Sequence, residues 1–201
     1  IIILGKSADV VFEIVLVVSN KESAPGLAWA RGEGVPTACV DHRAYASREA
    51  FDGAVEAALL AARTELVAHA GFMRIQSDSF VQRWAGRQLN IHPSLLPSFK
   101  GLKPHQQALE AGVRISGCTV HFVTAELDGG PIVAQAAVPV IEGDTAETLA
   151  DRILVVEHRL YPQALAHVAT GRARLVGNRV QLDCDSDAPV DGALYSPTAP
   201  A

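Results

Sequence analysis

The sequence predicts an α/β fold: a Rossmann-like, doubly wound and mostly parallel sheet with an antiparallel extension towards the C-terminus. Short β-branched apolar runs alternate with helical segments through the first half of the chain. Two long strand-like runs then follow each other without a helix between them, and a hairpin-like segment comes last. The 201 residues are 49% hydrophobic and 19% charged, which is typical of a compact globular protein. We expect one domain over residues 1–182 and a flexible tail over 183–201.

The first half is expected to alternate strands with helices. The apolar runs that predict strands lie at 14–18, 36–40, 65–70 and 88–91. The segments that predict helices lie at 25–31, 47–63 and 77–84, with Ser47 as the N-cap of the second.

The second half has a different pattern. A helix is expected at 104–111 and two strands at 116–123 and 131–140. Asp144 and Glu147 resemble a capping box that starts a helix reaching about residue 157. Pro162 should interrupt this helix, and a second helical piece should end at Gly171. Residues 174–176 and 179–181 predict a closing hairpin.

The beginning of the chain is short for a doubly wound fold, which normally opens with a strand, a glycine-bearing turn and a helix. Residues 1–5 are either an opening strand or the tail of a helix whose beginning is absent, and we favour the helix tail. No glycine-rich phosphate loop is visible. We therefore expect that the first strand and the phosphate loop are missing from this sequence.

Composition excludes several classes of protein. The net charge of −5 and the lack of a basic run argue against nucleic acid as a partner. No apolar stretch is long enough to span a membrane, and no secretory leader is recognisable. Cys39, Cys118 and Cys184 are widely spaced, as free thiols are in a reducing cytoplasm. We expect a cytoplasmic protein without a metal site.

Asn90 and His92 lie at the end of a predicted strand and are separated by one residue. Residues i and i+2 of a strand point to the same side, so both side chains can face one substrate. A carboxamide can donate to a developing oxyanion, and an imidazole can exchange a proton near neutral pH. The alternative is structural, with Asn90 capping a turn and His92 in a loop before Pro93.

Asp128 lies in a turn before Gly129 and Gly130. A carboxylate beside His92 would favour the protonated imidazolium. An Asx-turn is an equally good interpretation of this aspartate. Thr119 and His121 should project from one face of a strand near the site, with His121 as a supporting residue. Lys100, Lys103 and His105 form a small basic patch that could attract phosphate or the glutamates of a folate, or could simply be solvated.

Several segments resemble the glycinamide ribonucleotide (phosphoribosylglycinamide) formyltransferase family of the formyltetrahydrofolate-dependent formyltransferases. The longest are AGFMRI at 70–75, LNIHPSLLP at 89–97 and ELDGGP at 126–131. Shorter matches are SNK at 19–21, SREA at 47–50, EH at 157–158 and YP at 161–162. The resemblance covers about residues 1–182, and the motifs occur in order and at suitable spacing.

The resemblance implies transfer of a formyl group from 10-formyltetrahydrofolate to the amine of glycinamide ribonucleotide. Asn90 would donate a hydrogen bond to the formyl oxygen, and protonated His92 would stabilise the tetrahedral oxyanion. Asp128 would keep His92 protonated and help to relay a proton through water. The co-substrate would be the folate, the other partner would be the small-molecule nucleotide, and the protein would be a monomer or homodimer.

The same resemblance assigns the binding residues. Those that would bind the folate are Arg48, Met73, Arg74, Ile75, Gln76, Asn90, Val123, Thr124, Ala125, Glu126, Leu127 and Asp128. Those that would contact the nucleotide are Gly71, Pro93 and Glu157.

Other interpretations of the function stay open. Within the superfamily they are a formyltetrahydrofolate hydrolase and the methionyl-tRNA and sugar-amine formyltransferases. Outside it, the chain could be a folate-binding protein without activity. The family's Gly-Ser-Asn phosphate turn does not occur before Ile14, which puts nucleotide binding by this sequence in question.

Overall fold

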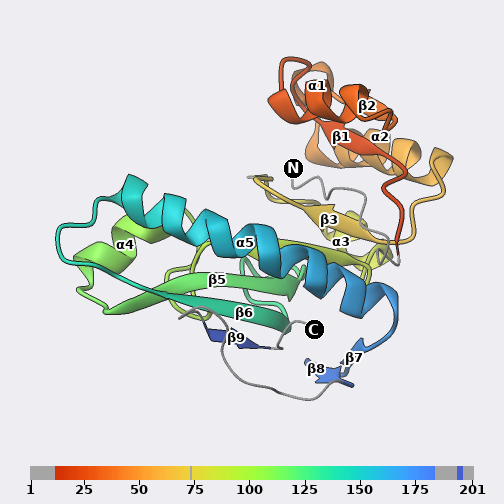
Figure 1. Ribbon diagram of the computed structural model, residues 1–201. Helices are drawn as coiled ribbons and strands as arrows, with labels where there is room; N and C mark the ends of the chain where they lie inside the picture. Colours follow the sequence, from red (N-terminus) through yellow and green to blue (C-terminus); the bar gives the residue numbers. More distant parts are fainter. Residues whose placement is uncertain (1–11, 73, 184–193, 197–201) are drawn as a thin grey trace. The chain divides into compact units, whose positions relative to one another are not determined.

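The computed structural model describes residues 12–72, 74–183 and 194–196 (Figure 1). The chain forms two compact units, residues 1–88 and 89–201, and each is described by itself. The expectations for residues 1–5, Met73 and Cys184 lie outside the described residues. The extent of one domain over 1–182 stays a prediction.

The first unit alternates strands and helices, as predicted. Its elements are β1 (Val17–Ser19), α1 (Pro25–Gly32), β2 (Thr37–Cys39), the 3-10 turn η1 (His42–Ala44), α2 (Arg48–Ala61), β3 (Val67–His69) and α3 (Asp78–Arg83). Strands β1 and β2 pair in parallel through the crossover helix α1, with Val18 opposite Ala38. The predicted N-cap of α2 is confirmed, because the Ser47 hydroxyl accepts a hydrogen bond from the Ala50 amide at 3.1 Å.

The second unit is built on an antiparallel sheet. Its elements are β4 (Gln88–His92), α4 (Pro104–Glu110), β5 (Ile115–Phe122), β6 (Ile132–Pro139), α5 (Ala146–Ala169), β7 (Ala173–Val176), β8 (Arg179–Leu182) and β9 (Leu194–Ser196). Strands β4, β5, β6 and β9 are neighbours in that order, and each pair is antiparallel. The α/β class, the antiparallel extension and the β7–β8 hairpin are confirmed.

Part of the predicted flexible tail is a strand. Leu194–Ser196 form β9, which pairs with β6 and places Tyr195 opposite Ala136. The composition of the tail could not predict this pairing, because a three-residue strand depends on an open sheet edge elsewhere in the chain.

The prediction that Pro162 interrupts the last helix is wrong. Helix α5 runs without a break over 24 residues and contains Pro162 (Figure 1). The helix on both sides of Pro162 is held in place by packing. Its buried residues there are Leu160, Tyr161, Ala164 and Leu165. The Tyr161 hydroxyl also donates a hydrogen bond to the Leu89 carbonyl at 3.1 Å. This tertiary packing offsets the backbone hydrogen bond that proline cannot make.

The start of α5 also differs from the prediction. The N-cap is Thr145, which forms a capping box with Thr148. Asp144 precedes the cap and binds Arg152 through both carboxylate oxygens, at 2.7 and 2.8 Å. The N-cap therefore lies one residue later than predicted, and the helix begins at Ala146. None of the helices in the described ranges is long and apolar enough to cross a membrane.

Candidate active site

The site is built on two cross-strand residue pairs of the sheet. In the β4–β5 ladder, Asn90 lies opposite His121, and His92 lies opposite Thr119. Directly opposed residues project from the same face, and so do residues i and i+2 of each strand. The four side chains therefore share one face of the sheet, as the spacing of Asn90 and His92 predicted.

The turn after β5 brings Asp128 to this face. Its Oδ2 atom lies 3.5 Å from Nδ1 of His92, and both side chains are 8% exposed. Asp128 has a positive φ of 48°, and its Oδ2 accepts a hydrogen bond from the Gly101 amide at 2.9 Å. Gly130 allows the tight turn, because a Cβ there would clash with the Phe122 carbonyl oxygen. The predicted convergence of amide, imidazole and carboxylate is confirmed as geometry.

Both ring nitrogens of His92 have acceptor partners. Nδ1 lies at ion-pair distance from Asp128, and Nε2 lies 2.9 Å from the carbonyl oxygen of Phe99. An imidazolium has two N–H donors and satisfies both partners, whereas neutral imidazole has only one. The arrangement thus suits a protonated ring. No sequence pattern indicates the contribution of Phe99, because it is made by a backbone carbonyl in the loop after β4.

His121 is the partner of Asn90. Its ring is buried, its Nδ1 lies 2.9 Å from the Phe122 carbonyl oxygen, and its Nε2 lies 3.4 Å from Asn90 Nδ2. Burial lowers the pKa of His121, aided by the charges of His92 and Lys100 and opposed by its backbone hydrogen bond and Asp128. In the neutral ring, Nδ1–H donates to Phe122 and Nε2 accepts from Asn90. His121 thereby orients the carboxamide of Asn90.

Asp128 also faces His121. Its Oδ1 atom lies 3.7 Å from His121 Nε2, so the two carboxylate oxygens face two different imidazoles. The spacing of His121 to Thr119 in the sequence predicts a supporting role for His121. The contact with Asn90 needs the β4–β5 register, which spacing within one strand cannot supply.

The segment predicted to bind the folate, residues 123–128, forms the turn after β5, beside Asn90, His92 and His121. Lys100 and Glu126 form an exposed ion pair of 2.7 Å, and the Thr124 hydroxyl donates to the Glu126 carbonyl at 3.3 Å. Leu127 is 58% exposed, although it is apolar. The segment therefore presents an apolar side chain to solvent next to the cluster of Asn90, His92, His121 and Asp128. The folate-binding role of Val123, Thr124, Ala125, Glu126 and Leu127 stays a prediction.

The other predicted folate residues belong to the first unit. The Arg74 guanidinium lies 5.4 Å from the ring centroid of Phe51, Gln76 Nε2 lies 3.4 Å from His69 Nε2, and Ile75 is exposed. Arg48 is the first residue of α2. Their role in binding folate, together with that of Met73, stays a prediction.

The predicted nucleotide-binding residues belong to both units. Gly71 is in the first unit with a φ of +64°, whereas Pro93 directly follows His92. Glu157, on α5, lies largely in the protein interior, and this burial raises its pKa to about 7. Burial, with a smaller contribution from the charge of Glu157, raises the pKa of Cys118, whose side chain points away from the face that carries Thr119. The substrate contacts of all three residues stay predictions.

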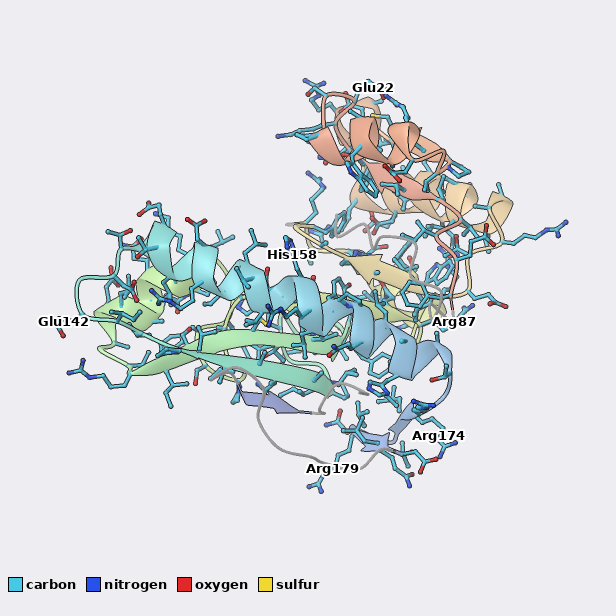
Figure 2. All side chains as sticks on the ribbon, viewed as in Figure 1. Glu22, Arg87, Glu142, His158, Arg174 and Arg179 are labelled. Atoms are coloured by element: carbon cyan, nitrogen blue, oxygen red, sulfur yellow. The ribbon has the colours of Figure 1, made fainter. Side chains whose placement is uncertain are left out.

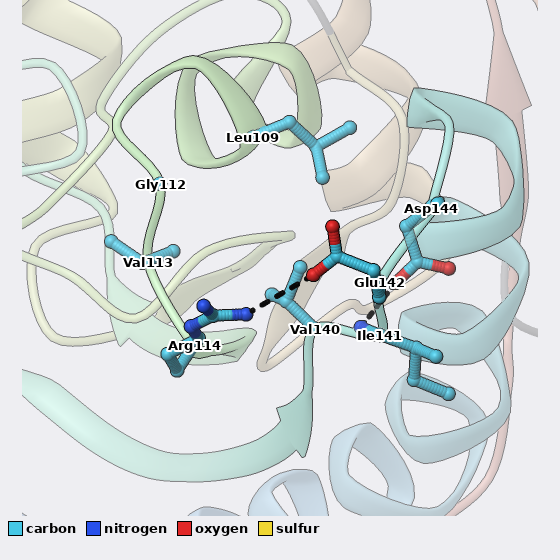
Figure 3. A pocket seen from close by; sticks show the side chains of 9 residues that line it. Leu109, Gly112, Val113, Arg114, Val140, Ile141, Glu142 and Asp144 are labelled. Carbon is cyan, nitrogen blue, oxygen red and sulfur yellow. Dashed lines mark hydrogen bonds and ion pairs between the residues drawn. The ribbon is translucent and has the colours of Figure 1, made fainter.

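A pocket of about 300 Å³ lies at the opposite end of β5 and β6 (Figure 3). Arg114 and Glu142 at its rim form an exposed ion pair of 3.6 Å, and Asp144 accepts from the Ile141 amide. None of the predicted site residues lines it. Across the described parts of the chain, no cluster of three or more histidine, cysteine or acidic side chains is arranged to hold a metal ion.

Comparisons with known proteins agree with this geometry. Residues 4–165 match the formyl transferase family. The chain is 46% identical over 167 residues to phosphoribosylglycinamide formyltransferase from Escherichia coli (strain K12), covering 83% of this chain and 79% of that protein. A glycinamide ribonucleotide transformylase structure from Symbiobacterium toebii matches with a TM-score of 0.81 and 51% identity, covering 83% and 79% of the two chains.

A longer relative contains the same region. The trifunctional purine biosynthetic protein adenosine-3 of Gallus gallus is 55% identical over 163 residues, or 81% of this chain. The chain spans only 16% of the length of that relative. On the family match and the Escherichia coli relative together, this chain belongs to the formyl transferase family and, within it, to the phosphoribosylglycinamide formyltransferases.

Proposed function

We propose that this protein transfers the formyl group of 10-formyltetrahydrofolate to the amine of glycinamide ribonucleotide, a step of purine biosynthesis. The observation that carries the proposal is the arrangement of Asp128 between the imidazoles of His92 and His121, beside the carboxamide of Asn90. Relatives named for this reaction match most of the chain.

Formyl transfer needs an oxyanion site. The amine attacks the formyl carbon, the carbonyl oxygen gains negative charge, and the intermediate collapses with release of the folate nitrogen. Asn90 has a second amide N–H besides the one directed at His121, and that donor serves the formyl oxygen. The imidazolium of His92 provides the positive charge that stabilises the same oxygen.

The reaction also moves a proton from the attacking amine to the leaving nitrogen. Asp128 is the carboxylate of the cluster, and a water held by it can accept the first proton and deliver the second. In this role Asp128 keeps its negative charge before and after the reaction. Its backbone bond from Gly101 holds the carboxylate in place throughout.

The co-substrate in this proposal is the formyl-folate, and no metal takes part. We place the protein in the cytoplasm, because the two cysteines that the structure describes, Cys39 and Cys118, are both free thiols. The net charge of −5 agrees with small-molecule substrates rather than a nucleic-acid backbone.

The direct test is an assay with 10-formyltetrahydrofolate in the presence and absence of glycinamide ribonucleotide. The proposal expects folate release that requires the nucleotide and produces formylated glycinamide ribonucleotide. His92→Ala should lower kcat by roughly 100-fold or more, as expected for a group that stabilises an oxyanion. Exposed His158 on α5 (Figure 2) provides the matched control His158→Ala, which should retain wild-type turnover.

Two outcomes would favour the alternatives. Formate release without the nucleotide indicates a hydrolase, and heat on titration with folate without any transfer indicates a binding protein. Equal activity of His92→Ala and wild type would remove His92 from the mechanism.

A further inference from the structure

Three residues form a row across β4, β5 and β6. His92 is opposite Thr119, and Thr119 is opposite Gln135. Thr119 is fully buried and polar, and the chemistry described above does not use it. Gln135 lies two strands away from His92.

The Thr119 hydroxyl has three partners. It donates to the Ser94 carbonyl at 2.7 Å, and it accepts from the Leu96 amide at 3.0 Å and from Gln135 Nε2 at 2.9 Å. Gln135 Nε2 also donates to the Leu96 carbonyl at 3.0 Å. Two strands thus bind the backbone of the loop that follows His92. These four hydrogen bonds, and not packing alone, define the position of the loop backbone.

The same loop carries the partner of His92. The buried Ser94 hydroxyl donates to the Ser98 carbonyl at 2.6 Å, which links the anchored part of the loop to the residue before Phe99. The Phe99 carbonyl oxygen then lies 2.9 Å from His92 Nε2. The connection runs from Gln135 through Thr119 and the loop backbone to one nitrogen of the His92 ring. The other ring nitrogen faces Asp128.

We infer that Thr119 and Gln135 are positioning residues for His92: they anchor loop 94–98 so that the Phe99 carbonyl orients the imidazole towards Asp128. This inference rests on the proposed function of His92 in formyl transfer. Its chemical reason is that oxyanion stabilisation depends on preorganised donors, and a displacement of about 1 Å can cost about 100-fold in rate.

The test uses isosteric substitutions in the full chain. Thr119→Val removes the hydroxyl and keeps the shape, and Gln135→Met removes the amide. Each should lower kcat by roughly 10- to 100-fold and change KM less than kcat, because the displaced imidazole acts on the transition state. The pH profile of kcat should shift as well. Thr119→Ser retains the hydroxyl and should recover most of the wild-type rate.

Matched controls remove the same groups elsewhere. Exposed Thr170 donates to the Ala166 carbonyl, and exposed Gln106 donates to Glu110. Thr170→Val and Gln106→Met should leave kcat and the pH profile unchanged. A purely structural role of Thr119 would lower the thermal midpoint of Thr119→Val without changing kcat or its pH profile, and that result would overturn the inference.

A second readout is independent of activity. In the unliganded protein labelled with ¹⁵N-histidine, Thr119→Val should shift the ring signals of His92 and leave those of His158 unchanged. Unchanged His92 signals together with wild-type kcat refute the positioning role. Shifted His92 signals in a protein whose wild type transfers no formyl group refute the proposed function and retain the positioning role.

Discussion

Asn90 and His121 face each other across the β4–β5 ladder, with the carboxamide nitrogen 3.4 Å from Nε2 of the ring. The Nδ1 atom of the ring is already used by the Phe122 carbonyl. The neutral ring therefore accepts from Asn90, and in the proposed reaction this contact sets which amide atom faces the formyl carbonyl. A protonated His121 has no lone pair to offer, so this relationship depends on pH.

Replacing His121 by leucine should reduce kcat. The variant leaves the Asn90 carboxamide free to rotate, and the loss of one orienting hydrogen bond corresponds to about tenfold in rate. Steady-state kinetics with both substrates would measure this effect, with His158→Ala as the control. Unchanged kcat and KM would mean that Asn90 does not depend on His121.

The ring of His121 should titrate below its ordinary pKa, because burial is the largest influence on it. The folded state then binds fewer protons than the unfolded state between the lowered pKa and about 6.5. Stability contributed by this group is present above about pH 6.5 and is lost as the pH falls through that window. Histidine NMR titration would measure the midpoint, and a midpoint above 6.5 would contradict the prediction.

Asp128→Asn should abolish most turnover while keeping the loop. The asparagine oxygen can still accept from the Gly101 amide, but the negative charge facing His92 and His121 is lost. We expect kcat to fall by roughly 100-fold or more. The circular dichroism spectrum and thermal midpoint should remain close to wild type. Asp128→Glu, which restores the charge on a longer side chain, should be intermediate; an active Asp128→Asn protein would exclude the carboxylate from proton transfer.

Glu157 should make the stability of the protein fall as the pH rises towards neutrality. Burial raises the pKa of its carboxyl to about 7, compared with the ordinary 4.5. The folded state therefore binds more protons than the unfolded state between these values, and stability from this group decreases across that window. Glu157→Gln removes the dependence, so its thermal midpoint should exceed that of wild type at pH 8.

The same variant tests nucleotide binding. If Glu157 accepts from ribose hydroxyls, Glu157→Gln should raise KM for glycinamide ribonucleotide by roughly tenfold and leave KM for the folate unchanged. Equal nucleotide KM values for variant and wild type at pH 8 would remove Glu157 from the substrate site.

Asp144 should protect the fold at neutral pH but not in acid. Its hydrogen bonds from Arg152, the Ile141 amide and Thr148 hold the pKa of the carboxyl well below its usual range. A lowered folded-state pKa contributes stability above the unfolded value of about 4, and this stability is lost as the pH falls below it. Asp144→Ala should lower the thermal midpoint at pH 7 by about 5 °C. The difference from wild type should shrink at pH 3; a constant difference would contradict the role of the charge.

Local patterns were sufficient for most elements. Periodicity and turn residues predicted the parallel β1–α1–β2 unit, the Ser47 cap and the β7–β8 hairpin, because each depends on residues close together in the chain. They failed at Pro162, where burial of Tyr161 and its neighbours outweighs the local preference to end a helix. They also failed at β9, whose partner strand is β6.

By itself, the sequence determined the α/β class, the family and the three candidate catalytic residues, since Asn90 and His92 share a face through strand periodicity and the motifs lie in order. Only the tertiary structure decided that Asp128 faces two imidazoles, that His121 orients Asn90 and that Thr119 and Gln135 anchor the loop carrying Phe99. The physical reason is the register of antiparallel strands. Hydrogen bonds between strands join residues that are distant in sequence, and backbone carbonyls such as that of Phe99 carry no sequence signal.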